Sequence, residues 1–360
     1  MAPDAFKNQE FWVYGSGSFA HSIVDQLEAL GFHINGVIDH LHIGSTFHSS
    51  KSEFVILDPM KVRLTGETQI VLGVYNLYGD LKKISATFGD TVKCISPVEL
   101  YQLFSQYGLD LESYWLSTDF EIFSTFSKEI EKFRNLLCDE DSRALLSSIL
   151  NYRSSGELQF LPSPRPLTEQ YLADDLSTPP LKLRVIDLGA CQGENLSAFI
   201  ESGREFVAGY LLEPDLKNIE VLKIRLAELN LTNLECHALG AWNETTTLSF
   251  DASGTTGASL SAEGGVKVKV VALDDFIPMD FVPNLIKMDI EGAELEAING
   301  MNRIIESYVP HLAISVYHKP TDLWALGNIL SERFPDKYRF YLRNYGHQTF
   351  DTVLYAVPKD

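Results

Sequence analysis

Residues 185–194 constrain the fold of this chain most strongly, because their sequence, VIDLGACQGE, combines an apolar run with closely spaced glycines. The run ends at Asp187, then Gly189 and Gly193 follow, and an amphipathic run begins at residue 195. This order predicts a buried strand, a tight turn and a helix. Glycine allows the turn to adopt positive φ and to approach a ligand closely, because no Cβ intervenes. The turn is therefore a candidate binding site, in which the Asp187 carboxylate can accept hydrogen bonds from an amine or a hydroxyl.

A second apolar strand that ends in an acid follows about one βα unit later, at residues 209–214, GYLLEP. In doubly wound sheets a carboxylate at the tip of the second strand binds ribose hydroxyls, so Glu213 predicts a nucleoside ligand. Cys191 stands where the dinucleotide fingerprint has its middle glycine, which argues against a pyrophosphate on the helix N-terminus. An adenosine with a short charged tail, as in S-adenosylmethionine, fits this pattern better.

The length and charge of the chain disfavour some classes of function. Its 360 residues suffice for two domains, each with its own core. A formal charge of −20 opposes binding to nucleic acid, whose phosphates require lysine and arginine. No apolar run reaches the length of a membrane span, and residues 1–10 lack the features of a signal peptide. The four cysteines are scattered without metal-ligand spacing, so we expect reduced thiols in a cytoplasmic protein.

The N-terminal stretch also has a strand followed by a glycine turn. Residues 11–20, FWVYGSGSFA, contain a GxGxxA pattern with Gly15 and Gly17, and the next strand ends at Asp39. This context predicts a small Rossmann-like unit, whose further strands we expect at 54–57, 69–75 and 94–97. Two interpretations remain open: a nucleotide or nucleotide-sugar site contacted by Gly15, Gly17 and Asp39, or a unit that only packs as a scaffold or in a homo-oligomer. The stretch resembles the N-terminal domains of sugar-modifying acyltransferases, which bind nucleotide-linked sugars.

Residues 110–153 change to helical spacing, and Asp139 or Asp141 is the expected N-cap between two helices. Prolines at 162–166 and 179–180 then mark a boundary. We therefore expect a Rossmann-like domain at 1–108, a helical connector at 109–165 and a second α/β domain at 166–360.

The second domain shows the strand order of a doubly wound fold. Further strands are expected at 234–239, 285–292 and 312–318, and the chain ends in a hairpin-like pair at 338–345 and 351–357. Ala238 and Leu239 follow the third strand and are expected to cover an adenine face. The small and polar run at 254–261 is either a lid over the acceptor or an ordinary loop. Five strands joined by helices and closed by a terminal antiparallel strand pair predict the class I methyltransferase fold.

Several motifs in one register carry a family resemblance. They are DLGA at 187–190, EPD at 213–215, IKMDIEGAE at 286–294, SVYH at 315–318 and TVLYA at 352–356. Together they resemble the FkbM family of S-adenosylmethionine-dependent methyltransferases over about residues 135–357, including DEDS at 139–142 and EQY at 169–171. The resemblance implies methyl transfer to a hydroxyl oxygen of a small molecule or glycan, with sugars and polyketides among the family's acceptors. The N-terminal unit lies outside the family's common core, and we expect it to select a nucleotide-activated or glycan-linked acceptor.

Candidate catalytic residues gather where the predicted fourth and fifth strands end. Methyl transfer to an alcohol needs an in-line arrangement and removal of a proton. His318 is the candidate general base because the ordinary pKa of histidine is near neutral, although it could instead be structural. Asp289 and Glu291 are expected either to orient His318 or to bind Mg²⁺, for which oxygen ligands are suitable, and no metal site is assigned. Lys287 is expected only to pair with an acid. The expected cofactor contacts are Asp187, Gly189, Ala190, Gly193, Glu194, Glu213, Pro214, Ala238 and Leu239.

Two other functions remain as alternatives from the sequence. A nicotinamide-dependent enzyme acting on nucleotide sugars would use the first Rossmann-like unit, and its activity would survive Asp187→Ala. A non-catalytic scaffold would not bind S-adenosylmethionine. The preferred hypothesis is an O-methyltransferase that acts on a sugar, nucleotide sugar or glycan.

Overall fold

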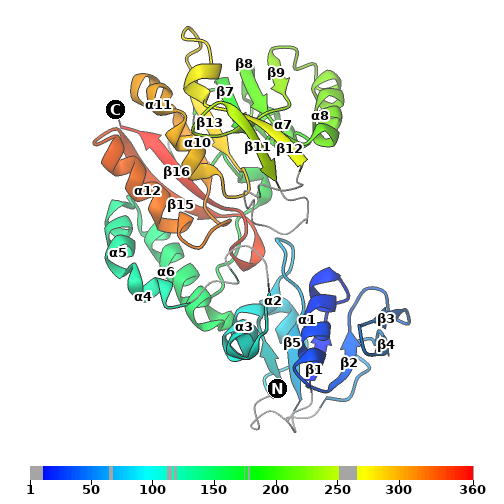
Figure 1. Ribbon diagram of the computed structural model, residues 1–360. Coiled ribbons are helices and arrows are strands. Elements are labelled where there is room, and N and C mark those ends of the chain that lie inside the picture. Colours follow the sequence, from blue (N-terminus) through cyan, green and yellow to red (C-terminus); the bar gives the residue numbers. More distant parts are fainter. Residues whose placement is uncertain are drawn as a thin grey trace. The chain divides into compact units, whose positions relative to one another are not determined.

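The computed structural model describes residues 11–64, 68–111, 116, 120–173, 175–176, 179–250 and 266–359 (Figure 1). The run at 254–261, for which a lid was considered, lies outside these residues. Contacts divide the chain into two units: unit 1 comprises Met1–Thr125, Ser147–Ser163 and Gly346–Phe350, and unit 2 comprises Phe126–Leu146, Pro164–Tyr345 and Asp351–Asp360. The chain therefore passes more than once between the units, and the contiguous three-part division stays a prediction.

Unit 1 contains a four-stranded parallel sheet in the order β2-β1-β5-β6. Its elements are β1 (Phe11–Tyr14), α1 (Ser18–Ala29), β2 (Ile34–Ile38), β3 (Thr46–His48), β4 (Glu53–Val55), β5 (Gln69–Leu72), α2 (Leu81–Ala86), β6 (Lys93–Ile95), α3 (Pro97–Phe104), η2 (Ser105–Tyr107), α4 (Ile122–Thr125) and η3 (Leu158–Phe160). The parallel strands, the glycine turn after β1 and the helix that follows agree with the sequence pattern.

The prediction that residues 54–57 form a strand of the parallel sheet is wrong. Strands β3 and β4 form a separate antiparallel hairpin, in which Phe47 pairs with Phe54. The Ser49 N–H donates to the Ser52 carbonyl and closes the turn locally, so this short segment pairs with itself. Only Leu57 joins the parallel sheet, through a bridge to Ile38.

Two helices in the middle of the chain follow the predicted pattern. They are α5 (Ser127–Leu136) and α6 (Glu140–Ser155). Asp139 caps α6, because its Oδ1 accepts the Ser142 N–H at 2.8 Å, which confirms the first of the two expected N-caps. The division between the two units falls inside α6, after Leu146.

Unit 2 contains a seven-stranded sheet in the order β15-β16-β14-β13-β7-β8-β9, and β16 is antiparallel to both of its neighbours. This order confirms the class I methyltransferase fold. The remaining elements of the unit are η4 (Leu167–Glu169), β7 (Lys182–Leu188), α7 (Leu196–Glu201), β8 (Glu205–Leu212), α8 (Leu216–Glu228), β9 (Leu234–His237), β10 (Gly240–Ala241), β11 (Thr246–Phe250), β12 (Val266–Val271), α9 (Leu273–Phe276), β13 (Leu285–Met288), α10 (Glu294–Asn299), α11 (Asn302–Tyr308), β14 (His311–Ser315), α12 (Asp322–Arg333), β15 (Tyr338–Asn344) and β16 (Thr352–Pro358), while η5 (His347–Thr349) belongs to unit 1.

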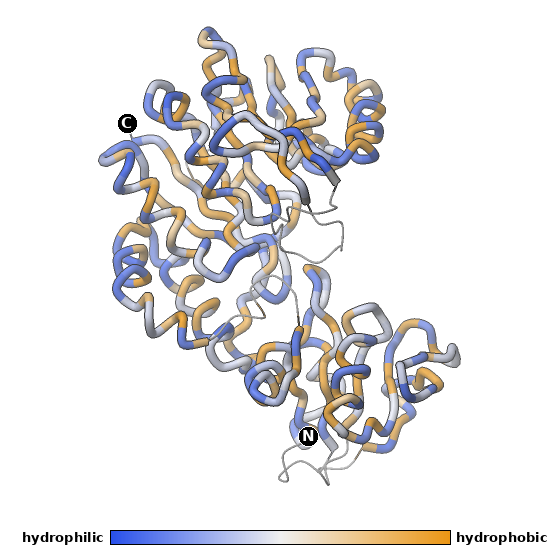
Figure 2. Tube along the Cα trace, viewed as in Figure 1, coloured by the Kyte–Doolittle hydropathy of each residue, from blue (hydrophilic) through white to orange (hydrophobic). Residues whose placement is uncertain are grey.

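The core of unit 2 lies on both faces of this sheet. One face packs against α7 and α8 through a cluster that includes Val185, Phe199 and Leu222. Because successive strand residues point to opposite faces, Ile186 and Ile286 face the other layer, where α10, α11 and α12 lie (Figure 1). All four residues of β13 are buried, and apolar residues run along the central strands (Figure 2), as expected for parallel strands that are covered on both faces.

Unit 2 also contains a small three-stranded sheet in the order β10-β12-β11. In the described part of the chain, no helix has both the length and the apolar character that a bilayer crossing requires.

Candidate active site

The strand register brings the predicted motifs to one edge of the larger sheet. Leu188, at the end of β7, pairs with Met288 of β13 on one side and with Leu212 of β8 on the other. Met288 pairs in turn with Ile314 of β14. All four strands are parallel, so the residues that follow them meet at the carboxyl edge, where doubly wound folds bind ligands.

The glycine turn after β7 is shaped by its contacts with neighbouring elements. Gly189 has φ +75°, and a Cβ there would lie 1.8 Å from the Asp289 carbonyl oxygen. Gly193 has φ +76°, and its Cβ would lie within 3 Å of the Leu196 and Leu222 side chains. Both glycines are therefore required by backbone conformation and by close packing of the loop against β13 and α8.

The Glu213 carboxylate ties this loop to the tip of β8. It is buried, and its oxygens accept the N–H groups of Cys191 and Asp215, each at 2.9 Å. Cys191 is not glycine but has φ +46°, a conformation that costs energy for a residue with a Cβ. The hydrogen bond to Glu213 helps to hold the loop in this conformation.

Asp187 pairs with a buried lysine from the next strand. The Lys287 Nζ lies 3.0 Å from Asp187 Oδ1 and donates to the Gly189 carbonyl at 2.5 Å. Burial opposes the charge of Lys287, but Asp187 and Asp289 outweigh burial and raise its pKa. The expected pairing of Lys287 with an acid is confirmed. Through its hydrogen bond to the Gly189 carbonyl, Lys287 also stabilises the glycine turn.

The other expected cofactor contacts surround this turn. Ala190 is buried, Leu239 is half-buried, and Glu194, Pro214 and Ala238 are exposed. Glu194 accepts the Gln192 N–H at 3.2 Å, within the loop itself. These residues lie on the loops after β7, β8 and β9, and their contact with a cofactor stays a prediction.

His318, which follows β14, lies in a cluster of carboxylates. Its Nδ1 is 2.9 Å from Glu294 Oε1 of α10, and its Nε2 is 3.3 Å from Asp289 and 3.6 Å from Glu291. His318 and Glu294 are buried, whereas the Glu291 side chain is 68% exposed. The Ile290 N–H also donates to Glu294. This second hydrogen bond holds the carboxylate in place beside the imidazole.

The carboxylates control the protonation of His318. Burial lowers its pKa, but Glu294, Asp289 and Glu291 outweigh burial and raise the pKa to about 9. At neutral pH the ring is therefore a positively charged imidazolium, with a proton on both nitrogens. A general-base role, which stays a prediction, requires His318 to lose one of these protons first.

Asp289 has partners that the sequence did not indicate. Its Oδ2 accepts the hydroxyl of Tyr171 at 2.9 Å, and its Oδ1 lies 3.4 Å from the hydroxyl of Tyr317. Tyr171 is 118 positions away in the sequence, so no spacing rule could pair it with Asp289. Its only signal was its place in the EQY motif at 169–171.

Two further acids of this region titrate unusually. Burial, together with repulsion from Asp289, raises the pKa of Asp351 to about 6. Burial and repulsion from Glu294 raise the pKa of Asp322 to about 7. Acidic side chains are thus so closely spaced at this edge that Asp322 and Asp351 are only partly ionised near neutral pH.

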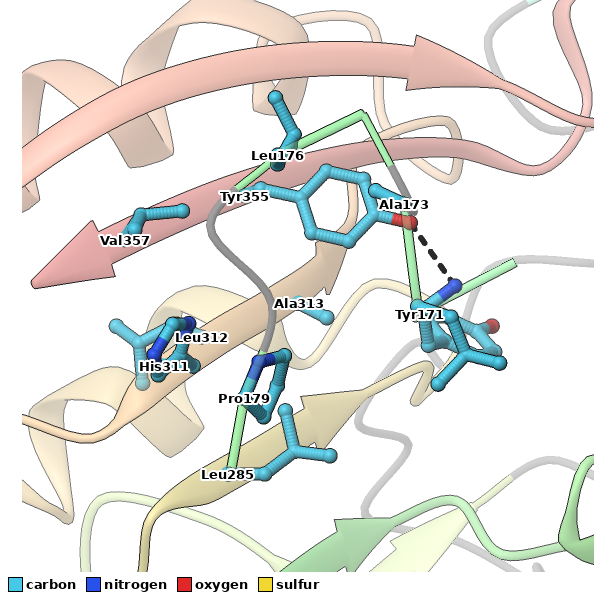
Figure 3. Close-up of a pocket in the computed structure, with 11 residues that line it drawn as sticks. Tyr171, Ala173, Leu176, Pro179, Leu285, His311, Leu312, Ala313, Tyr355 and Val357 are labelled. Carbon is cyan, nitrogen blue, oxygen red and sulfur yellow. Dashed lines mark hydrogen bonds between the residues drawn. The ribbon is translucent and has the colours of Figure 1, made fainter. Parts of the chain in front are cut away.

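A separate small cavity lies behind Tyr171 (Figure 3). It measures about 10 Å³ and is lined by side chains such as Leu285, His311 and Val357, which leaves room for about one water molecule. The Tyr171 N–H donates to the Tyr355 hydroxyl at 2.9 Å beside it. Its size excludes it as a cofactor site.

In unit 1, the residues predicted to bind a nucleotide come together. Asp39 accepts hydrogen bonds from the Ser16 hydroxyl at 2.6 Å and from the Leu41 N–H at 2.9 Å. A Cβ on Gly15 would lie 2.8 Å from the Gly73 carbonyl, whereas Gly17 has open space around its Cα. Gly15 therefore serves close packing of β1 on β5, and nucleotide binding by this turn stays a prediction.

A comparison with protein families identifies the second unit. Residues 187–349 match the family described as methyltransferase FkbM domain. This part of the chain is an S-adenosylmethionine-dependent methyltransferase domain of the FkbM type. The match confirms the resemblance seen in the motifs, and its range includes the glycine turn, Glu213, Asp289 and His318.

One solved structure has the same fold as this chain, and others are similar to part of it. Methyltransferase FkbM from Methylobacillus flagellatus has 22% identity and a TM-score of 0.77, over 97% of this chain and 90% of that chain. An rRNA methylase from Streptococcus thermophilus has 14% identity and a TM-score of 0.36, over 54% of this chain and 96% of that chain. Fibrillarin from Aeropyrum pernix, with bound S-adenosyl-L-methionine, has 12% identity and a TM-score of 0.33, over 54% and 75%. None of the curated proteins compared with the chain matches it.

Proposed function

We propose that this methyltransferase transfers the methyl group of S-adenosylmethionine to a hydroxyl oxygen of a sugar, nucleotide sugar or glycan. The observation that carries the proposal is the His318 imidazole, which is held at Nδ1 by buried Glu294 and presents Nε2 toward Asp289 and Glu291. This group lies at the same sheet edge as the glycine turn. An alcohol acceptor, unlike a more acidic acceptor, needs such a group to take its proton.

In this proposal the adenosine binds between the glycine turn and Glu213. The Glu213 carboxylate would accept the ribose hydroxyls, and the loops with Glu194, Pro214, Ala238 and Leu239 would surround the methionine tail and the adenine. S-adenosylmethionine bound there would supply the methyl group for the new C–O bond, with its C–S bond broken and S-adenosylhomocysteine released. Asp289 and His318 would lie on the acceptor side, where His318 Nε2 would accept the hydroxyl proton.

The high pKa of His318 sets a condition on this step. Because the group is protonated below about pH 9, only a small fraction of the enzyme holds a free base at neutral pH. Transfer should therefore become faster as the pH rises toward 9. Glu294 would act as the positioning residue, since its contact with Nδ1 fixes the ring so that Nε2 exchanges the proton.

A divalent metal is a further part of the proposal that needs its own test. Among the described residues, Asp289, Glu294 and His318 can each offer one ligand atom, and these atoms lie within 4.8 Å of one another. A metal there would compete with the proton on His318. Activity that survives EDTA would exclude Mg²⁺ from the mechanism, and activity restored by added Mg²⁺ after EDTA would support it.

The N-terminal unit is proposed to select the acceptor. Its turn at Gly15, Ser16 and Gly17 carries the Ser16–Asp39 hydrogen bond, and a ribose or sugar hydroxyl could replace the serine hydroxyl as donor to Asp39. The variant Asp39→Ala should then raise the KM for a nucleotide sugar and leave the affinity for S-adenosylmethionine unchanged.

The acceptor class is tested by methyl uptake from labelled S-adenosylmethionine. Nucleotide sugars, free oligosaccharides and simple aliphatic alcohols are offered in parallel, with His318→Ala as the control. Label on a sugar hydroxyl, lost in the control, supports the proposal. Label only on aliphatic alcohols, or on nitrogen or carbon, would reject the sugar assignment and leave the methyltransferase activity intact.

A further inference from the structure

Tyr171 lies outside β13 but contacts Lys287 on that strand and Asp289 directly after it. It precedes β7 in the chain, and it is 1% exposed. Its hydroxyl is 2.9 Å from Asp289 Oδ2, and the ammonium of Lys287 lies 5.4 Å from the centre of its ring. One buried side chain thus touches the acceptor-side carboxylate and the lysine that pairs with Asp187.

The direction of the hydroxyl bond follows from its other partner. The Gln170 amide donates to the Tyr171 oxygen at 3.1 Å, so the hydroxyl hydrogen is available for Asp289. Burial, with repulsion from Asp289 and Asp351, raises the pKa of Tyr171 well above its usual value. The group therefore stays neutral and remains a donor.

The two oxygens of Asp289 have different partners because of this bond. Oδ2 accepts the Tyr171 hydroxyl, whereas Oδ1 lies 3.3 Å from His318 Nε2 and 3.4 Å from the Tyr317 hydroxyl. A carboxylate without the first bond could rotate about its Cβ–Cγ bond. The Tyr171 hydroxyl, which makes the shorter of the two tyrosine contacts, thus helps to set how Asp289 meets the imidazole.

The backbone at Tyr171 indicates that its position is enforced. Tyr171 has φ +66°, in the left-handed region that is unfavourable for an aromatic residue. Its N–H is bound by the Tyr355 hydroxyl at 2.9 Å (Figure 3), and that hydroxyl contacts Tyr345 at 2.8 Å. These contacts hold a conformation that the chain alone would not favour, and they place the ring over Lys287.

We propose that Tyr171 is a positioning residue for both halves of the site: its hydroxyl orients Asp289 toward His318, and its ring holds Lys287 against Asp187. The inference rests on the proposed roles of Asp289 and His318. It deepens the proposed function, because it assigns acceptor-side and cofactor-side effects to different parts of one side chain.

Two substitutions separate these parts. Tyr171→Phe keeps the ring and removes the hydroxyl, whereas Tyr171→Leu removes both. Tyr338→Phe is the matched control, because Tyr338 is also buried in unit 2 and its hydroxyl has no hydrogen-bond partner among the described residues. Thermal melting of each variant identifies loss of folding.

The readouts are the affinity for S-adenosylmethionine by calorimetry and the rate of methyl transfer to the acceptor found in the labelling screen. Tyr171→Phe should keep the affinity within about twofold and lower the transfer rate by about tenfold to 100-fold, because a hydrogen bond to a charged group is lost. Tyr171→Leu should also weaken cofactor binding by about threefold or more, because the ring no longer faces the ammonium. Tyr338→Phe should change neither quantity.

A crystal structure of Tyr171→Phe tests the inference without any methyl acceptor. It should show the Asp289 carboxylate turned away from His318. The inference is overturned if the Asp289 carboxylate keeps its orientation in this crystal structure. It is also overturned if the rate of methyl transfer by Tyr171→Phe stays within twofold of the wild type, or if Tyr171→Phe lowers the affinity for S-adenosylmethionine as much as Tyr171→Leu does. If the screen finds no sugar acceptor, the crystal and calorimetric results still decide the role of Tyr171.

Discussion

The variant Glu294→Gln should strongly lower the pKa of His318. The rise of this pKa from its ordinary 6.5 to about 9 corresponds to a preference of about 3 kcal/mol for the imidazolium over the neutral ring. Burial acts in the opposite direction and is not removed by the substitution. Since Glu294 is the nearest carboxylate and the largest favourable influence, we expect the pKa of the variant to lie at or below 6.5.

The assay is an NMR titration of protein with labelled histidine. The chain has nine histidines, and the His318 signal is assigned by its absence in His318→Gln. Glu291→Gln is the matched control: Glu291 is mostly exposed and 3.6 Å from Nε2, so its loss should lower the pKa by well under one pH unit. A His318 pKa near 6.5 in the wild type, or one that stays near 9 in Glu294→Gln, would refute this account of the cluster.

The same perturbation has a consequence for stability. The folded pKa of His318 is raised, so its contribution to stability is complete below about pH 6.5 and is lost as the pH rises through about 9. Denaturant unfolding at pH 6.5 and pH 10 should therefore differ by about 3 kcal/mol more in the wild type than in His318→Gln. An equal pH dependence in the two proteins would contradict the assigned pKa.

The sequence predicted the sheet of unit 2 because each of its strands is a short apolar run with a recognisable end. Strand ends at Asp187, Glu213 and Asp289 could be placed at one edge, since parallel strands share their carboxyl ends. The partners of these acids could not be predicted in the same way. Tyr171 reaches Asp289 only through the fold, and the high pKa of His318 depends on three distances that no motif specifies.

The N-terminal unit shows the opposite limit of sequence reasoning. The GxGxxA pattern correctly predicted a strand, turn and helix, but the same glycine can serve a ligand or a neighbouring strand. Gly15 packs against the Gly73 carbonyl, which a pattern alone does not reveal. The β3–β4 hairpin was missed because its strands are three residues each and lack a clear alternation.

Three further predictions concern the cofactor side and the reaction. Glu213→Ala should abolish binding of S-adenosylmethionine in calorimetry, whereas His318→Ala should slow transfer and leave binding within about threefold of the wild type; equal losses of binding would contradict separate roles. Gly189→Ala should destabilise unit 2 by about 2–4 kcal/mol in denaturant unfolding, because its Cβ meets the Asp289 carbonyl at positive φ. The control Gly203→Ala has open space at φ +82° and should cost only about 1 kcal/mol. Methyl transfer should rise about tenfold per pH unit between pH 6 and 8 and level off above about pH 9, and a flat profile would exclude His318 as the base.

The most direct test of the account is a crystal structure with S-adenosylhomocysteine. We predict the ribose hydroxyls on the Glu213 carboxylate, the adenosine against the glycine turn at 189–193, and the sulfur facing Asp289 and His318. Adenosine bound elsewhere, or a crevice at this sheet edge that stays closed by side chains in the presence of the ligand, would contradict it.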